Sequence, residues 1–212
     1  METLIKQITE KVNSSEGSFF IGVSGHGASG KTTFSKSLCE ALRVDYNLLH
    51  TDSYIIENQH LSNTYACYET QGNISKSKIT AYMPIRHELS SLARDIEILK
   101  KGHDLITIDK PWDPARTLMG SKKVTIVEGM SVAFLEPFAF NSSIYIYTDS
   151  ETELSRRKKR DVEDRGRDLE SLINAQSHRR DQYDLFMHPL KDKFDVIVDD
   201  SDDMFKIIKS NL

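Results

Sequence analysis

Short apolar runs alternate with longer amphipathic stretches from one end of the chain to the other. The apolar runs predict buried strands at Phe19–Val23, Tyr46–His50, Val124–Val127, Ile144–Thr148 and Asp195–Val198, with a weaker strand at Leu105–Ile108. The amphipathic stretches have apolar residues three or four positions apart, which predicts helices at Leu4–Val12, Lys31–Leu42, His87–Lys101, Glu151–Asp164, Leu169–Phe186 and Met204–Ile208. Strands that alternate with helices favour an α/β fold, with a mostly parallel sheet and helices on both of its faces.

The segment Ile55–Thr80 shows no clear period. It is rich in Asn, Ser, Gln, Tyr and Lys, and it is long for a plain connection. Long polar segments in compact domains are usually binding loops or mobile flaps, so we expect residues 55–80 to form one of these. Nothing else in the pattern suggests a domain boundary, and residues 1–212 are interpreted as a single domain.

Composition and charge exclude several classes of protein. The chain has 28 Lys and Arg against 32 Asp and Glu, a net charge of −4 that argues against a general nucleic-acid binder. No apolar run approaches the roughly 20 residues of a membrane span, and Met1–Asn13 lacks the unbroken apolar centre of a signal peptide. Two cysteines are too few for a disulfide framework or a thiolate metal site. We therefore expect a cytoplasmic protein that does not bind membranes.

The most specific motif is Gly25-His26-Gly27-Ala28-Ser29-Gly30-Lys31-Thr32, which fits G-x-x-x-x-G-K-S/T at every fixed position. A predicted strand precedes it and a predicted helix follows, so backbone N–H groups and a helix N-terminus converge on bound phosphates. Lys31 would reach the β/γ oxygens and Thr32 would offer its hydroxyl to Mg²⁺. The alternative is a turn with a capped helix. We interpret the motif as an ATP or GTP site, and His26, whose type the motif does not fix, as incidental. The predicted nucleotide-binding residues are Gly25, Gly27, Ala28, Ser29, Gly30, Lys31, Thr32 and Thr33.

Two carboxylates end predicted strands where parallel sheets place their ligands. Asp52 follows Tyr46–His50, and Glu128 follows Val124–Val127. Either acid alone has the alternative role of capping the next turn. Beside a phosphate-binding loop, however, phosphoryl transfer needs one carboxylate for the metal and another for the acceptor hydroxyl. We assign Asp52 as the general base. Glu128 is assigned, with Thr32, to the metal shell or to the orientation of a water molecule, and the two carboxylate roles are open to exchange.

A third feature is the cation-rich segment 153–168, interpreted as a helical lid. A run of charges is usually a solvated face. Next to a phosphate-binding loop, an arginine brought in by a closing segment would instead stabilise the charge of the transferred group. Gly166 offers the bend that such a segment needs. The candidate catalytic arginines are Arg160, Arg165 and Arg167, with Arg157 and Arg167 also placed on the acceptor.

In this order, these residues resemble the phosphoribulokinase/uridine kinase family of P-loop kinases. The resemblance runs through the loop with Gly22-Val23-Ser24 before it, Asp52-Ser53-Tyr54, Glu128-Gly129, Thr148-Asp149, the lid, and Asp195–Val198. It implies a three-layer P-loop NTPase fold with a helical lid. It further implies that the γ-phosphate of ATP moves to a sugar-type hydroxyl, with Asp52 as the base and lid arginines on the phosphates and the acceptor.

The acceptor side departs from the family pattern. Where uridine kinases carry Phe-Asp-His-Pro, this chain reads Ala81-Tyr82-Met83-Pro84, with Tyr82 in place of the acid. Where they carry Tyr-Asp-Phe…His…Arg, this chain reads Asp109–Arg116, in which the Arg survives as Arg116 but the Tyr and the His do not. The lone Trp112 either stacks on a flat acceptor or packs beneath a loop. We take Tyr82, Trp112 and Arg116 as candidate acceptor contacts and residues 55–80 as an acceptor-side loop or flap.

Together these features predict an ATP- and Mg²⁺-dependent kinase that acts on a hydroxyl of a small molecule, with a nucleoside such as uridine or cytidine as the leading acceptor. A kinase of the same fold for pantothenate, nicotinamide riboside or a sugar-like compound is the first alternative. The second is a non-catalytic nucleotide switch in which residues 55–80 change partner contacts, although a switch needs no acceptor base. A homo-oligomer is left open.

Overall fold

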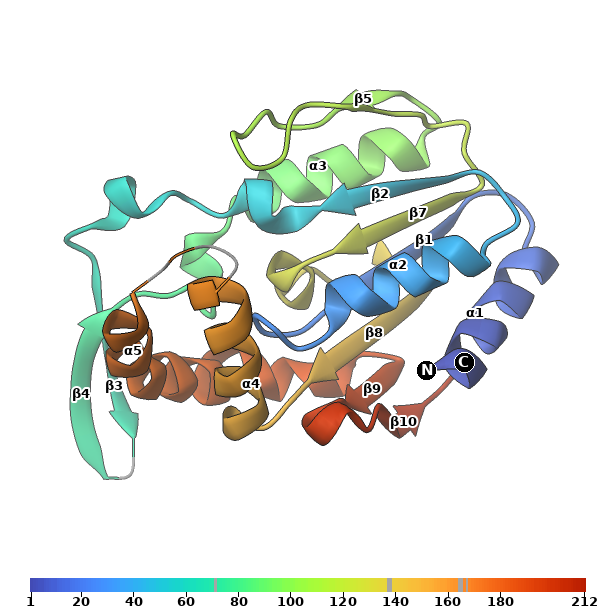
Figure 1. Ribbon diagram of the computed structural model, residues 1–212. Helices are drawn as coiled ribbons and strands as arrows, with labels where there is room; N and C mark the ends of the chain where they lie inside the picture. The colour runs from blue at the N-terminus through green and yellow to red at the C-terminus, as the bar shows by residue number, and fades with distance from the viewer. Residues whose placement is uncertain (71, 137–138, 164–165, 167) are drawn as a thin grey trace.

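A six-stranded sheet in the order β10-β9-β8-β1-β7-β2 forms the centre of the computed structural model, which describes residues 1–212 except 71, 137–138, 164–165 and 167 (Figure 1). Its strands are β1 Phe19–Ser24, β2 Tyr46–His50, β7 Val124–Glu128, β8 Ser142–Tyr147, β9 Val196–Asp199 and β10 Lys206–Ser210. All pair in parallel except β10, which runs antiparallel to β9. Five predicted strands and the mostly parallel sheet are thus confirmed.

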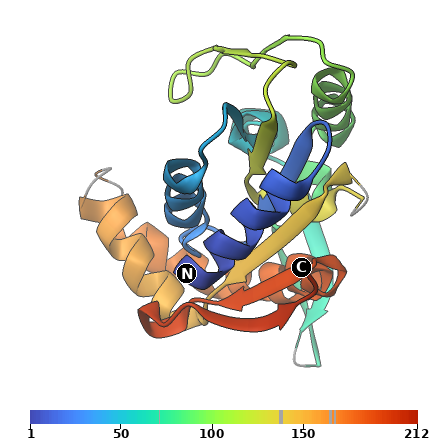
Figure 2. The ribbon, with the colours of Figure 1, turned by 90° about the vertical axis from the view of Figure 1, so that its right-hand side faces the viewer.

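Both faces of the sheet are buried, which explains the near-continuous apolar character of its strands. Phe19, Ile21 and Val23 point to one face, where α1 and α2 cover them, while Phe20 points to the other, beside α3. Figures 1 and 2 show the sheet between these helices. The result is the predicted three-layer α/β fold. The α-helices are α1 Glu2–Ser14, α2 Lys31–Ala41, α3 Leu89–Lys100, α4 Ser150–Arg157 and α5 Leu169–Gln182.

The predicted helix Met204–Ile208 is wrong. This segment contributes to β10, after a turn in which Asp202 and Asp203 adopt left-handed conformations. Five residues are too few for periodicity to distinguish a helix from a strand. Pairing with β9 satisfies backbone groups that an exposed sheet edge would leave open, and this gain is available only in the folded sheet.

Three other predicted elements are modified. The weak strand at Leu105–Ile108 forms β5 Leu105–Ile106, which pairs with β6 Thr117–Leu118 and stays outside the central sheet. Helices α4 and α5 each end in a π-helical turn, at Lys158–Glu163 and Tyr183–Met187.

None of the helices in the described ranges is long and apolar enough to cross a membrane.

The polar segment 55–80 contains a β-hairpin, made of β3 Tyr65–Thr70 and β4 Asn73–Lys78. Ala66 and Tyr68 face inward, so the alternation that predicts a strand is present but short. The fully buried Gln182 of α5 fixes the hairpin base, because its Oε1 accepts from Thr80 N at 2.9 Å and its Nε2 donates to Lys78 O at 2.9 Å. The second half of the predicted loop is therefore a strand pair whose C-terminal end is hydrogen-bonded to α5.

Candidate active site

The loop between β1 and α2 is bent by residues in unusual backbone conformations. Gly25 has φ 145°, and a Cβ there would lie 1.8 Å from the carbonyl oxygen of Ile146 on the neighbouring strand β8. Ala28 and Gly30 have φ values of 67° and 92°. Left-handed residues in such a turn bring successive N–H groups into one concave surface, which suits an anion.

Two groups of this loop lack the partners that a buried site normally provides. The hydroxyl of Ser29 is buried and has no hydrogen-bond partner. Helix α2 begins after Gly30 without a side chain that caps its N-terminus, so its first N–H groups and its positive dipole end face the loop. Phosphate oxygens would satisfy both, and the loop therefore fits the predicted phosphate site.

Lys31, the first residue of α2, is 8% exposed and points into the loop. Its Nζ donates to the carbonyl oxygen of His26 at 2.7 Å. Burial lowers the pKa of Lys31, while the carboxylates of Glu128 and Asp52 oppose this shift. Its cation is thus held between the loop and two acids, where a triphosphate would place its oxygens.

His26 is not incidental, because it fastens the loop to the sheet. The ring is fully buried: Nδ1 lies 2.9 Å from Gly27 O, and Nε2 accepts the Thr148 N–H at 2.9 Å. The ring of Tyr183 meets it edge-on, with centroids 4.8 Å apart. Burial lowers the pKa of His26 to about 4, so the ring is neutral at physiological pH. The loop motif leaves this position free, and only the fold shows its role.

Stability is expected to fall between pH 7 and pH 5 because of two buried histidines. The pKa of His26 and of His87 is about 4 in the folded chain against an ordinary 6.5, with burial as the main cause. The unfolded chain therefore takes up protons first as the pH falls below 6.5. Each histidine should cost about 2 kcal/mol of unfolding free energy at pH 5 relative to pH 7.

Urea unfolding of the wild type and of His87→Gln at both pH values measures this effect. The variant should lose about 2 kcal/mol less than the wild type between pH 7 and pH 5, since the carboxylates titrate alike in both proteins. An equal loss in the two proteins would contradict the assignment.

Strand order places Glu128 beside the loop. Strand β7 lies between β1 and β2, and Glu128 is in register with both Val23 and His50. Thr32 Oγ1 lies 3.4 Å from each carboxylate oxygen of Glu128, and His50 Nδ1 lies 3.0 Å from its Oε2. The predicted pair of Thr32 and Glu128 is thus brought together, and His50 is a neighbour that the sequence analysis missed.

The environments of the two acids differ. Burial alone would raise the pKa of Glu128, but the hydrogen bond with His50 and the charge of Lys31 outweigh it and lower that pKa. Desolvation raises the pKa of Asp52 against the opposing charge of Lys31, and the negative charge of Glu128 raises it further. The bond with Glu128 raises the pKa of His50. Glu128 is therefore the better permanent anion and Asp52 the better proton acceptor.

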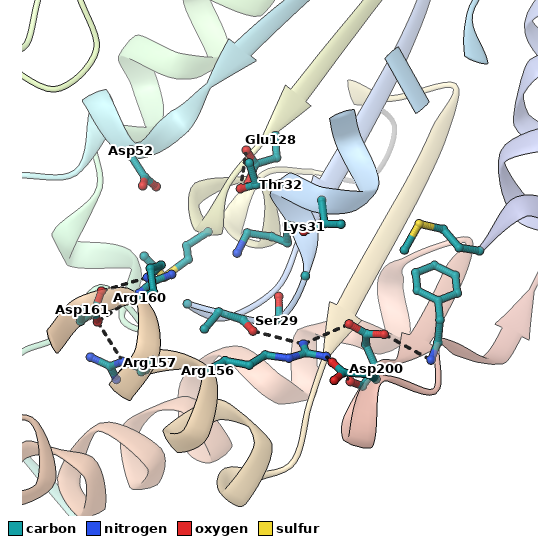
Figure 3. A pocket seen from close by; sticks show the side chains of 18 of the residues that line it. Ser29, Lys31, Thr32, Asp52, Glu128, Arg156, Arg157, Arg160, Asp161 and Asp200 are labelled. Carbon is teal, nitrogen blue, oxygen red and sulfur yellow. Dashed lines mark hydrogen bonds and ion pairs between the residues drawn. The ribbon is translucent and has the colours of Figure 1, made fainter. Parts of the chain in front are cut away.

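Two cavities meet at these residues. The first, here called the loop cavity, has a volume of about 820 Å³ and is lined by residues 27–33 together with lid arginines (Figure 3). The second, here called the side cavity, has about 920 Å³ and lies toward Ile55–Asn58 and Trp112. Thr32, Asp52 and Glu128 line both. Gly25 does not line the loop cavity, and a Cβ there would instead meet the carbonyl oxygen of Ile146.

The segment predicted as a lid places Arg156, Arg157 and Arg160 at the loop cavity (Figure 3). Arg156 donates to Ala28 O at 3.3 Å and pairs with Asp200 at 3.0 Å. Arg157 is buried between Glu153 and Asp161, and Arg160 pairs with Asp161 at 2.9 Å. The other two predicted lid arginines, Arg165 and Arg167, lie outside the described residues.

Of Tyr82, Trp112 and Arg116, Trp112 lines the side cavity. Tyr82 lines neither cavity, because its ring is fully buried and its hydroxyl donates to Glu153 at 3.1 Å. Arg116 also lines neither, since it pairs with Asp113 at 2.6 Å and donates to Leu48 O. The structure thus does not support Tyr82 and Arg116 as acceptor contacts. It instead brings Arg86 to the side cavity and Arg179 to the loop cavity, and no motif marks either residue.

Comparisons with known proteins identify similar sequences and similar folds. The model of the phosphoribulokinase/uridine kinase family matches residues 20–204. A uridine kinase of Brevibacillus brevis is 29% identical over 185 residues, which are 84% of this chain and 83% of that protein. Uridine-cytidine kinase-like 1 of Mus musculus is 32% identical over 185 residues, 85% of this chain but 32% of the mouse protein. The structure of D-glycerate 3-kinase from Cryptococcus neoformans has a TM-score of 0.63 at 11% identity, covering 97% of both chains, and shows the shared fold.

Proposed function

The chain belongs to the phosphoribulokinase/uridine kinase family, and from this premise we propose that it transfers the γ-phosphate of ATP to a hydroxyl group of a small molecule. One observation carries the proposal: the loop cavity and the side cavity meet at Thr32, Asp52 and Glu128. A donor bound in one cavity and an acceptor in the other would face each other across these three side chains. Such positioning is most of what catalysis of phosphoryl transfer requires.

In the proposed step, Asp52 holds the acceptor hydroxyl in line with the γ-phosphorus and takes its proton. The acceptor oxygen forms a bond to the γ-phosphorus as the bond from that phosphorus to the β–γ bridging oxygen breaks, and ADP leaves. Lys31 releases the His26 carbonyl and places its charge on the phosphate oxygens. Arg160 would add positive charge to the transferred phosphoryl group, because its Nη2 lies close to the loop, 4.0 Å from where a Cβ on Gly27 would lie. Residues 153–168 would then act as the lid of a single kinase domain.

The residues present fit a magnesium ion. The Thr32 hydroxyl and the Glu128 carboxylate are oxygen donors 3.4 Å apart, and Mg²⁺ is usually held by one or two such ligands together with phosphate and water. When bound there, Mg²⁺ would neutralise part of the negative charge of the phosphates. His50 keeps Glu128 ionised and oriented toward Thr32.

The proposed activity leaves open which compound receives the phosphate. Because the relatives are named uridine kinase and uridine-cytidine kinase-like 1, uridine and cytidine are the first compounds to test. Trp112 on the wall of the side cavity would suit a flat base. Against a nucleoside, Tyr82 replaces an acid of the uridine kinase pattern and is buried away from the side cavity.

ADP release from Mg-ATP tests the proposed function, with Lys31→Ala as the blank. The panel contains uridine, cytidine, nicotinamide riboside, pantothenate, D-glycerate and ribulose 5-phosphate. We expect one class of acceptor to raise turnover well above the blank. If ATP binds and no compound raises turnover, the protein is better described as a nucleotide switch.

A further inference from the structure

Arg86 is a buried cation on the wall of the side cavity. It ends the short helical turn Pro84–Arg86, is 7% exposed, and lines the side cavity together with Asn58. Its Nη2 donates to Asn58 Oδ1 at 2.9 Å, while its Nε is buried without a partner. A buried guanidinium with an unsatisfied N–H is costly unless an anion completes it.

The carboxylates around the side cavity already have cationic neighbours. Glu57 pairs with Lys110 at 2.6 Å, Asp113 with Arg116 at 2.6 Å, and Glu128 with His50 at 3.0 Å. Asp52, the fourth, faces the charge of Lys31. Across the described ranges, no carboxylate comes within ion-pair distance of Arg86.

A second arginine, Arg179, adds to the positive charge around Arg86. Arg179 of α5 lines the loop cavity and stacks over the Tyr82 ring at 5.2 Å, and its Nε is also buried without a partner. Burial, together with the charge of Arg179, lowers the pKa of Arg86. The two guanidinium groups thus repel each other, and a ligand anion near Arg86 would relieve that repulsion.

We propose that the acceptor carries an oxyanion, a carboxylate or a phosphate, which binds Arg86 while its hydroxyl faces Asp52. This inference rests on the proposed function and names its substrate class. The guanidinium fork matches either oxyanion with two parallel hydrogen bonds. The acceptor is therefore a hydroxy acid or a sugar phosphate rather than a neutral nucleoside.

The wild-type panel gives the first test. D-glycerate and pantothenate represent carboxylates, ribulose 5-phosphate represents phosphates, and uridine and cytidine are neutral. We expect turnover with an anionic compound and none with the neutral ones. The two anionic arms show which oxyanion is recognised. Turnover with neutral compounds alone overturns the role of Arg86 and leaves the proposed function intact, whereas no turnover with any compound overturns both.

Variants give the second test, with the acceptor that the panel identifies. Arg86→Gln should lower kcat/KM for it by about 100-fold, mainly through KM, with the KM for ATP unchanged within about twofold. Arg86→Lys keeps the charge without the fork and should lose less, which also serves if Arg86→Gln does not fold. Arg43→Gln, an exposed arginine before β2, is the matched control and should behave as the wild type.

A purely structural role for Arg86 makes a different prediction. If Arg86 only anchored the segment through Asn58, then Asn58→Ala would break the same hydrogen bond and give the same loss as Arg86→Gln. We expect a clearly smaller loss for Asn58→Ala, since the cation remains in place. Equal losses in the two variants overturn the proposal.

Discussion

Asp52→Asn should lower kcat by about 10³-fold while the affinity for ATP stays close to that of the wild type, because a positioned general base contributes about 10²- to 10⁴-fold. Asparagine keeps the shape of the side chain and can still accept a hydrogen bond from the acceptor, but it cannot take the proton. ATP is held by the loop and Lys31, which the change leaves in place. Steady-state kinetics together with equilibrium ATP binding separate the two effects.

The raised pKa of Asp52 adds a pH dependence to this expectation. Desolvation is its main cause, so the carboxyl keeps its proton to a higher pH than the ordinary value of 3.8. Only the ionised form can act as a base, and wild-type kcat should fall as the pH drops through this raised value. The acid limb of the kcat profile therefore lies above pH 3.8.

The matched control for this variant is Asp45→Asn. Asp45 is exposed and lies before β2, at the end of that strand opposite to Asp52, so its loss should leave kcat unchanged. Near-normal turnover of Asp52→Asn would assign the base to another group. Glu128 would then be the next residue to test, since the two carboxylates lie at the ends of neighbouring strands.

The local sequence is sufficient to predict a feature whose residues are adjacent in the chain. The predicted phosphate-binding loop is contiguous, and its glycines, Lys31 and Thr32 predict its turn and the start of α2. The strands β1 and β7 were equally clear, because both of their faces are buried. Asp52 and Glu128 followed from the rule that parallel strands end at one edge.

The acceptor side was hard to predict because its residues meet only in the folded chain. His50 reaches Glu128 because β7 is inserted between β1 and β2, a strand order that no local pattern reveals. Arg86 lies in a short helical turn that no motif marks, and the motif position of Tyr82 predicts an acceptor contact although the fold buries its ring. Tertiary packing decides such positions, and a single sequence gives little information about it.

Gly25→Ala is expected to destabilise the fold by more than about 4 kcal/mol, which is exceptional for one methyl group. The added Cβ would lie 1.8 Å from the carbonyl oxygen of Ile146, and the φ of 145° is strained for alanine in any case. Because Ile146 belongs to the central strand β8, the backbone has little room to yield. Urea unfolding measures the loss directly.

Gly27→Ala, two residues away in the same loop, is the matched control. The nearest atoms to a Cβ at Gly27 are 4.0 Å away, on the side chains of Arg160 and Tyr82. Its unfolding free energy should therefore stay within about 1 kcal/mol of the wild type. Equal stability of the two variants would mean that the loop can move away from β8. In that case the buried ring of His26, which joins the loop to Thr148, would not hold it in place.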